Sequence, residues 1–345
     1  MSRVLVARLD SDGDVLLAGP TVRAVAAGAD EVVLLAGPRG AAAARLLPGV
    51  DEVLVWSCPW IEADPAPVDS AAVGRLVSDL QERRLDAALV LTSFHQSPLP
   101  LALVLRLAGV PWIGAVSEDY PGSLLDLRHQ LPDTGLHEAE RTLSLATAAG
   151  FPLPSSDAGG LAVRRPLPDR RDLTGDAPFV VVHPGASVPA RAPSVDWSYR
   201  LVKALRDAGS RVVVTGGPAE RALTRSVVGA SALDLGGRTD LAGLADVLDR
   251  AEVVVVGNTG PAHLAAAVGT PVVSLFAPVV PAERWRPFGV EHVLLGDQLT
   301  PCAATRARAC PVPGHPCLDG IDVGEVVDAV RRLTPVPARE LQVTA

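Results

Sequence analysis

The chain has too little positive charge to attract nucleic acid or an anionic membrane. Its 345 residues include 31 lysines and arginines against 39 aspartates and glutamates, and the formal net charge is −8. Lys203 is the only lysine. A protein with this charge has no overall field that draws in polyanions, so an anionic ligand needs a local site. We therefore expect no nucleic-acid partner.

Long apolar runs are also lacking. The longest, residues 99–116, is interrupted by Arg106, Gly109 and Pro111, as expected for a buried helix followed by a strand and not for a membrane span. Near the N-terminus Arg8 ends the first apolar run, and no signal peptide is visible. We expect a cytoplasmic protein, free or peripheral at the inner face of the membrane.

Cysteine is scarce, and its spacing does not form a zinc motif. The four cysteines are Cys58, Cys302, Cys310 and Cys317. Without a secretory signal they are expected to stay reduced. Seven and six residues separate the last three, and His315 lies among them, but no Cys-x-x-Cys pair occurs. Since structural zinc sites use closely spaced pairs, we expect no metal site.

The common glycine-rich nucleotide loops are missing, but residues 252–278 hold another candidate anion site. No Gly-x-Gly-x-x-Gly follows the first predicted strand, and no Walker A loop occurs. Instead, a β-branched strand leads into the turn 257–260, whose residues are Gly, Asn, Thr and Gly. An Ala-rich helix then begins at Pro261 and ends before Gly269. Free N–H groups and the helix dipole at such a turn favour an anion.

The rest of the chain predicts two α/β domains. Strands alternate with helices, which is typical of βαβ units on a parallel sheet. The alternation breaks in a stretch rich in proline and glycine, 152–177, where we expect one short strand near 161–164. We predict a Rossmann-like domain over 1–163, a linker over 164–176, a second such domain over 177–321, and a closing helix and tail over 322–345.

Every polar turn of interest follows a predicted strand. The four turns are 10–14, 183–187, 216–220 and 257–263. Ligands of open parallel sheets bind at the carboxyl ends of strands. Because one turn lies in the first predicted domain and three in the second, we expect a cleft between domains, with the ligand held mainly by the second.

The acidic turn Asp10–Asp14 reads Asp-Ser-Asp-Gly-Asp and has several interpretations. A calcium loop would need glycine where Val15 stands, and a phosphatase turn would need threonine or valine in place of Asp14. A metal-binding Asp-x-Asp of single-domain glycosyltransferases would fall later in the chain. Two interpretations remain open: a solvated turn in which Asp14 caps a helix beginning at Val15, and a general base facing the cleft.

The other turns carry groups that suit a phosphate or a nucleoside. Arg191 could clamp a phosphate bidentately, or lie in a surface loop. Glu220 could accept hydrogen bonds from a ribose diol, or serve only the strand-to-helix turn. His263 could donate to a phosphate from the first turn of its helix, or be an ordinary packed histidine.

Together these motifs resemble glycosyltransferase family 9, the heptosyltransferase-type glycosyltransferases. The segments that carry the resemblance follow the family's order across most of the chain: VLVARLDSDGDVLLAGPTVRAV (4–25), VVHPGAS (181–187), VVVTGGPAE (212–220), GGRTDLAGLADVL (236–248), NTGPAHLAAAVGTPVVSLFAP (258–278), ERWRPFG (283–289) and HPCL (315–318). The resemblance implies an α/β GT-B fold, two Rossmann-like parallel-sheet domains facing across a cleft. It also implies an inverting, metal-independent transfer of heptose from ADP-heptose to a glycan or glycolipid hydroxyl in lipopolysaccharide synthesis, without a cofactor.

The resemblance also assigns residues. By position, Asp14 resembles the catalytic base. The implied donor-binding residues are Ser187, Arg191, Glu220, Thr239, Asn258, Thr259, Gly260 and His263. Two departures concern the donor sugar: Asn258 stands where the family often has aspartate, and Arg191-Ala-Pro193 replaces Lys-Arg-Trp-Pro.

The acceptor is expected to lie against loops of the first domain. These loops are 58–68, 93–98 and 117–135, and their candidate contacts are His95, Tyr120 and Arg128. Besides a glycan or glycolipid, a small molecule would fit this expectation. Two other functions stay open: a GT-B nucleotide-sugar 2-epimerase, which needs no acceptor, and an inactive sugar-nucleotide-binding protein, against which Asp14 argues.

Overall fold

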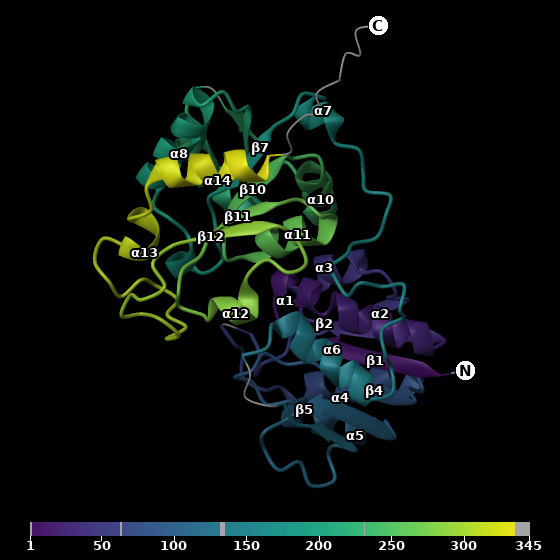
Figure 1. Cartoon of the computed structure of the whole chain (residues 1–345). Coiled ribbons are helices and arrows are strands. Elements are labelled where there is room, and N and C mark those ends of the chain that lie inside the picture. The colour runs from purple at the N-terminus through teal and green to yellow at the C-terminus, as the bar shows by residue number, and fades with distance from the viewer. Residues whose placement is uncertain (1, 63, 132–134, 231, 335–345) are drawn as a thin grey trace, which may run out of the picture. The chain divides into compact units, whose positions relative to one another are not determined.

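A computed structural model describes residues 2–62, 64–131, 135–230 and 232–334. The chain forms two compact units (Figure 1). Unit 1 comprises Met1–Pro168, Thr259–Gly269 and Val280–Gly289. Unit 2 comprises Asp169–Asn258, Thr270–Val279 and Val290–Ala345. The predicted tail from 335 onward lies outside the described residues.

Unit 1 is built on a six-stranded parallel sheet in the order β3-β2-β1-β4-β5-β6. The strands are β1 (Arg3–Arg8), β2 (Glu31–Ala36), β3 (Glu52–Val55), β4 (Ala87–Val90), β5 (Trp112–Val116) and β6 (Leu127–His129). The short edge strand β6 lies where the sequence predicts only turns. The inner strands are buried on both faces, which is why they read as nearly continuous runs of valine, leucine and alanine.

Eight helices of the described chain belong to unit 1. They are α1 (Asp12–Leu17), α2 (Gly19–Gly28), α3 (Ala41–Leu46), α4 (Ser70–Glu82), α5 (Leu99–Leu107), α6 (Glu138–Ala148), α11 (Gly260–Val268) and α12 (Ala282–Trp285). Helices α4 and α5 bury Leu80 and Leu105 against one face of the sheet. Helix α2 packs beside α6, and α1 packs beside α11. These contacts fix the position of the acidic turn in this unit.

Unit 2 has a second six-stranded parallel sheet, in the order β12-β11-β10-β7-β8-β9. Its strands are β7 (Val180–His183), β8 (Val212–Val214), β9 (Leu233–Asp234), β10 (Val253–Gly257), β11 (Val272–Leu275) and β12 (His292–Leu295). Its helices are α7 (Arg171–Thr174), η1 (Pro189–Arg191), α8 (Val195–Asp207), η2 (Pro218–Glu220), α9 (Arg221–Val228), α10 (Leu241–Asp249), α13 (Pro316–Asp319) and α14 (Val323–Leu333).

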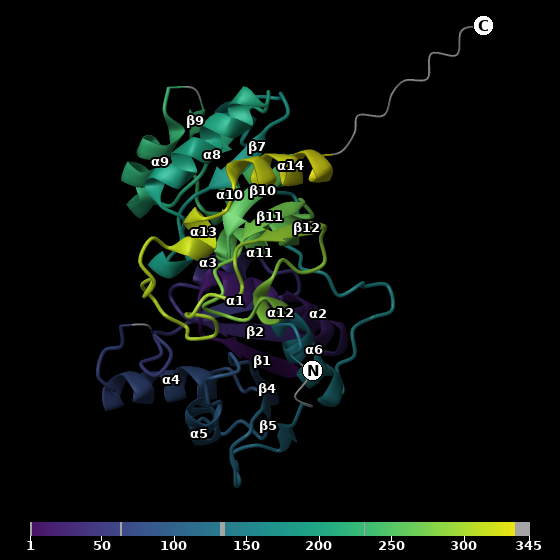
Figure 2. The same cartoon turned by 60° about the vertical axis from the view of Figure 1, so that its left-hand side comes forward.

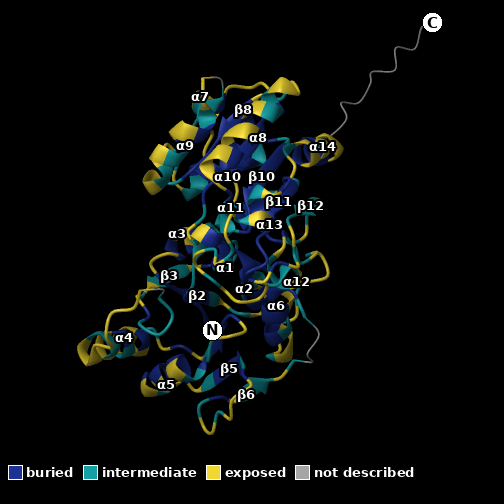
Figure 3. Ribbon diagram, turned by 90° about the vertical axis from the view of Figure 1, so that its left-hand side faces the viewer, coloured by how far each residue is buried: buried dark blue, intermediate teal, exposed yellow. Residues whose placement is uncertain are grey.

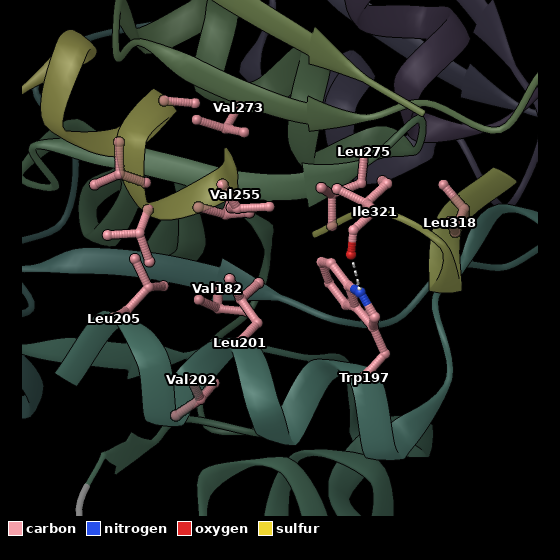
Figure 4. Packing of buried hydrophobic residues seen from close by; sticks show 14 of the residues in the cluster. Val182, Trp197, Leu201, Val202, Leu205, Val255, Val273, Leu275, Leu318 and Ile321 are labelled. Carbon is pink, nitrogen blue, oxygen red and sulfur yellow. Dashed lines mark hydrogen bonds between the residues drawn. The ribbon is translucent and has the colours of Figure 1, made fainter. Parts of the chain in front are cut away.

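The core of unit 2 lies under α8 and α14. Figure 2 shows α8 beside α9, and apolar side chains of all three helices join the strand residues in one buried cluster. Trp197 of α8 is fully buried there, and its indole N–H donates to the Ile321 carbonyl at 2.8 Å (Figure 4). Figure 3 shows the same pattern in colour, with buried strands and exposed outer helix faces. Among the described residues, no helix combines the length and apolar character needed to span a bilayer.

Both sheets have the same strand order when each is counted from its own first strand. The chain reverses direction across the sheet between β1 and β4 in unit 1, and between β7 and β10 in unit 2. Ligands of such sheets bind where these switch-point strands end. The predicted turns 10–14, 183–187 and 257–263 follow β1, β7 and β10. The prediction of two Rossmann-like parallel-sheet domains is therefore confirmed.

Two further local predictions were wrong. The single helix expected from Val15 is two helices, α1 and α2, because Pro20 has no N–H to donate to a preceding turn and instead occupies the first turn of α2. The strand expected near 161–164 is not formed. The backbone N–H of Arg164 donates to the Leu46 carbonyl at 2.7 Å, but residues 161–164 do not form the repeated backbone pairing of a β-strand.

Candidate functional site

The acidic turn after β1 does not gather its carboxylates for a cation. Asp12 accepts a hydrogen bond from the Ala43 N–H of α3 at 3.0 Å. Asp10 accepts from the Gln96 amide at 2.6 Å. Burial raises the pKa of both carboxyl groups. No three His, Cys, Asp or Glu side chains in the described chain are placed to hold a metal ion.

Asp14 has a separate environment at the start of α1. Its carboxylate accepts from the Ser11 hydroxyl at 2.8 Å and from the Ser11 N–H at 3.3 Å. The capping interpretation is therefore partly right, but the helix begins at Asp12, and Asp14 is its third residue. The Asp14 side chain keeps 22% of its surface exposed. One carboxylate thus stabilises the helix end and still reaches solvent.

Asp14 lies beside the N-terminus of α11. A Cβ atom on Gly13 would come within 3.1 Å of the Gly260 Cα and 3.2 Å of the His263 ring, so the glycine permits this close approach. Thr259 precedes α11 without capping it through its side chain. Burial alone would raise the pKa of Asp14, but Arg8, the Ser11 hydrogen bonds and His263 together lower it. Asp14 is ionised at neutral pH.

Sequence reasoning missed Arg8, the last residue of β1. This arginine is 1% exposed. Its Nη2 donates to Asp14 at 3.1 Å and to the Ser93 hydroxyl at 2.9 Å, and its Nε lies 3.0 Å from Asp10. Burial would lower the pKa of Arg8, but the facing carboxylates raise it. A charged residue at the end of a buried strand, next to the acidic turn, was the available signal.

In unit 2, Arg191 lies on η1 against the end of β10. A Cβ atom on Gly257 would come within 2.4 Å of the Arg191 carbonyl oxygen, so only glycine allows η1 this close. The neighbouring Ala190 donates to the Arg308 carbonyl at 3.0 Å, and its own carbonyl lies 3.2 Å from His315 Nε2. Ser187, just before η1, is exposed. The structure thus brings both predicted phosphate contacts to the carboxyl ends of β7 and β10.

The side chain of Asn258 is hydrogen-bonded to the protein backbone. It is 4% exposed. Its side-chain nitrogen donates to the Ala277 carbonyl at 3.1 Å, and its oxygen accepts from the Ala277 N–H at 3.1 Å. An aspartate could make only the second of these bonds, because a carboxylate has no N–H. Asn258, which stands where the family often has aspartate, therefore joins the ends of β10 and β11 by two buried hydrogen bonds.

Glu220 also has a structural partner. Its carboxylate accepts from the Gly217 N–H at 2.7 Å and lies 3.7 Å from His183 Nε2. A Cβ atom on Gly185 would come within 1.9 Å of this carboxylate. Burial lowers the pKa of His183 more than Glu220 raises it, so the imidazole is neutral near pH 7. Thr239 is half-buried just before α10.

The predicted acceptor-side residues differ in their surroundings. Tyr120 is 85% exposed. Arg128 donates to the backbone carbonyls of Ser117 and Glu118. His95 lines a hollow of about 310 Å³ with Trp60. Residues 63 and 132–134 of the predicted loops lie outside the described residues.

Unit 1 contains a pocket of about 510 Å³, lined mainly by the two loops 93–98 and 117–135 that the sequence predicts to face the acceptor. Phe94, His129, Arg141 and Arg284 are among its lining residues. Burial and the nearby Arg141 lower the pKa of His129. Arg141 and Arg284 bring positive charge to this pocket, and Glu118 brings negative charge.

None of the described cysteines forms a disulfide. Cys58, Cys302 and Cys317 are buried. Burial raises the pKa of the Cys58 thiol to about 12 and that of Cys317 to about 11. These thiols are protonated at neutral pH, so they behave as small apolar side chains.

Comparison with known proteins identifies the family. The model of Glycosyltransferase family 9 (heptosyltransferase) matches residues 73–315, which is most of the chain. The chain belongs to this family. The resemblance drawn from the motifs is thereby confirmed, and the protein is a family 9 glycosyltransferase.

Individual relatives agree with this assignment. Lipopolysaccharide heptosyltransferase 1 of Pseudomonas aeruginosa is 34% identical over 51% of this chain and 49% of its own length. The chain spans about half the length of the curated relatives it matches. A family 9 glycosyltransferase from Veillonella parvula superimposes with a TM-score of 0.79, at 15% identity over 96% of this chain and 97% of its own. E. coli ADP-heptose LPS heptosyltransferase II superimposes with a TM-score of 0.72, at 20% identity over 96% and 98%. These structures confirm the predicted GT-B fold.

Proposed function

We propose that this family 9 glycosyltransferase is an inverting, metal-independent heptosyltransferase that uses ADP-heptose. Two relatives support the sugar and its carrier: one is named a lipopolysaccharide heptosyltransferase, and the other an ADP-heptose LPS heptosyltransferase. The proposed acceptor is a hydroxyl of a lipopolysaccharide core glycan or glycolipid. We place the reaction in the cytoplasm or at the inner face of the membrane.

The single observation that carries the mechanism is Asp14 beside the N-terminus of α11. Asp14 is an ionised, partly exposed carboxylate, which suits a general base. It removes the proton of the acceptor hydroxyl while the acceptor oxygen bonds to the anomeric carbon. The bond from that carbon to the diphosphate oxygen breaks, and its electron pair stays on the diphosphate. A single displacement of this kind inverts the anomeric centre.

The leaving diphosphate is proposed to lie at the N-terminal end of α11. The backbone N–H of Gly260, the helix dipole and the His263 ring all favour negative charge there. Pro261 has no N–H, and the Ala262 N–H donates to the Thr259 carbonyl. Because these dipoles are already oriented, they stabilise the developing charge without reorganising. This supports a reaction that needs no metal ion.

The nucleotide end of the donor is proposed to bind to unit 2. Arg191 and Ser187 would hold phosphate oxygens, and Glu220 and Thr239 would face the nucleoside. The placement of η1 against Gly257 supports this role for Arg191. Asn258 would act through its backbone, since its side chain is bonded to Ala277.

The acceptor is proposed to enter along the pocket lined by Phe94, His129 and Arg141. The pocket has room for a sugar unit and offers both an aromatic face and positive groups. His95, Tyr120 and Arg128 stay predicted contacts for more distant parts of the acceptor.

The test is a two-substrate assay of the purified chain with ADP-heptose and a core glycolipid acceptor. Release of ADP together with a product of inverted configuration is expected, and activity should survive dialysis against EDTA. A strict need for a divalent cation would contradict the metal-independent mechanism. Conversion of the donor without acceptor would identify an epimerase, and donor binding without turnover an inactive binding protein.

A further inference from the structure

The buried guanidinium of Arg8 lies among three carboxylates, each reached through a different nitrogen atom. Nη2 contacts Asp14 at 3.1 Å, Nε lies 3.0 Å from Asp10, and Nη1 lies 3.9 Å from Glu138. Both Arg8 and Glu138 are 1% exposed. Arg8 ends β1, whereas Glu138 begins α6, so the two meet only in the folded unit.

Glu138 is a buried carboxyl group without close hydrogen bonds, and burial raises its pKa against the opposing effect of the neighbouring arginines. Neither carboxylate oxygen has a hydrogen-bond partner among the described residues. Three guanidinium groups face it instead: Arg8 at 3.9 Å, Arg141 at 3.8 Å and Arg284 at 3.9 Å. Its place in the first turn of α6 adds the favourable end of a helix dipole. A buried carboxylate is costly, and here the three guanidinium groups offset that cost while Glu138 balances their charge.

The N-terminus of α6 is itself fixed in place. His137, the N-cap, accepts from the Ala139 N–H through Nδ1 at 3.2 Å, and its Nε2 lies 2.9 Å from the Arg286 carbonyl oxygen. The His137 ring also stacks on Phe288 at 4.6 Å between centroids. Glu138 therefore faces Arg8 from a rigid support.

We propose that Arg8 is the positioning residue of Asp14, and that Glu138 opposes it through the same guanidinium. Arg8 holds one oxygen of Asp14 while Ser11 holds the other, which fixes the plane of the carboxylate. If the whole charge of Arg8 acted on Asp14, the carboxylate would be a poor proton acceptor. Sharing that charge with Glu138 and Asp10 restores base strength. The inference rests on the proposed role of Asp14 as the base.

The pH at which Asp14 is protonated should therefore depend on both Arg8 and Glu138, whose charges have opposite effects on its pKa. The groups that face Asp14 are Arg8 from β1, Asp10 from the same turn and His263 from α11, with Glu138 behind Arg8 on α6. Removing the positive charge of Arg8 should make Asp14 easier to protonate. Removing the negative charge of Glu138 should make it harder, because Arg8 is then shared by fewer carboxylates.

The experiment measures the pH profile of kcat/KM for wild type, Arg8→Gln, Arg8→Lys and Glu138→Gln. The acid limb is the fall in kcat/KM at low pH that protonation of the base causes. Relative to wild type, it is expected at higher pH in Arg8→Gln and at lower pH in Glu138→Gln. Arg8→Lys should keep the limb near its wild-type position but lose on the order of 10²-fold in kcat, because the fork that orients the carboxylate is gone. Arg23→Gln is the matched control, since Arg23 pairs with Asp157 at 2.6 Å elsewhere in unit 1.

A readout independent of catalysis separates the inference from the proposed function. The carboxyl ¹³C resonance of Asp14, assigned by its loss in Asp14→Asn, is titrated in the same variants. Opposite displacements of this titration support the inference even if Asp14→Asn stays active, in which case only the base role fails. Displacements that are absent, or that have the same sign in Arg8→Gln and Glu138→Gln, overturn it. If Arg8→Gln does not fold, the near-isosteric Glu138→Gln decides by the sign of its shift.

Discussion

At the scale of the residue, Asp14 combines a structural and a chemical role. Its carboxylate closes the first turn of α1 through Ser11 and also lies against Arg8 at the edge of the solvent. The two roles are compatible, because a carboxylate has about four acceptor positions and the Asp14 side chain keeps 22% of its surface exposed. That exposed part can receive a hydrogen bond from an acceptor hydroxyl.

The first prediction concerns this side chain. Asp14→Asn should lower turnover by roughly 10²–10⁴-fold, because the amide cannot accept the acceptor proton. Donor affinity, measured by calorimetry, should stay close to wild type, since Asp14 is not expected to hold the nucleotide. Asp12→Asn is the matched control, because its oxygen can still accept from Ala43. Near-normal turnover in Asp14→Asn would remove Asp14 from the mechanism.

The second residue-scale prediction is that Asn258→Asp destabilises the fold. The variant loses the bond to the Ala277 carbonyl and places a buried carboxylate against that oxygen, for an expected cost of about 1–3 kcal/mol. The introduced carboxyl would have a higher pKa folded than unfolded, so the loss should grow as pH rises above the unfolded pKa. Urea unfolding at pH 5 and pH 8 measures both effects. A loss that is equal at both pH values would contradict the buried pairing.

At the scale of the element, the approach of η1 to β10 depends on one glycine. Gly257→Ala would place a methyl group 2.4 Å from the Arg191 carbonyl, so η1 must move away from the strand end. Weaker donor binding is expected, together with a lower Tm. Gly74→Ala serves as control, because its added Cβ meets nothing within 4 Å on helix α4. An unchanged donor affinity would show that η1 does not hold the nucleotide.

A second prediction at this scale concerns Arg191 itself. Arg191→Ala should weaken donor binding by roughly 1.5–3 kcal/mol, the usual contribution of a hydrogen bond to a charged group. Calorimetric titration with ADP, which retains the diphosphate, measures the loss. A change confined to turnover would instead assign Arg191 to the transition state.

At the scale of the whole molecule, the prediction is a donor that stabilises the fold by mass action. A ligand that binds only the native state at 100 times its Kd adds about 2.7 kcal/mol of stability. In a thermal-shift panel of nucleotide sugars, ADP-heptose should give the largest rise in Tm. A larger rise with a uridine or guanosine sugar would change the proposed donor while leaving the family unaffected.

The sequence predicted the fold well because its signals are local. Runs such as Val253–Val256 have the composition of strands buried on both faces, and the polar turns after them are read directly from neighbouring residues. Proline and glycine mark where α11 begins and ends. The break at Pro20 was missed because the apolar pattern continues across it, although proline chemistry was sufficient to find it.

The residues around Asp14 could not be predicted from local patterns, because contacts between distant parts of the sequence bring them together. Arg8 and Glu138 are 130 positions apart, and only the parallel order β1-β4-β5 followed by α6 brings them together. The pairing of Asn258 with Ala277 likewise needs β10 and β11 to be neighbours.

The sequence by itself thus determined most of the strands, the turns that follow them and the family, because composition and periodicity act over a few residues. The tertiary structure decided which charges surround the predicted base and which polar side chains are committed to the backbone, because burial and distance depend on the path of the whole chain.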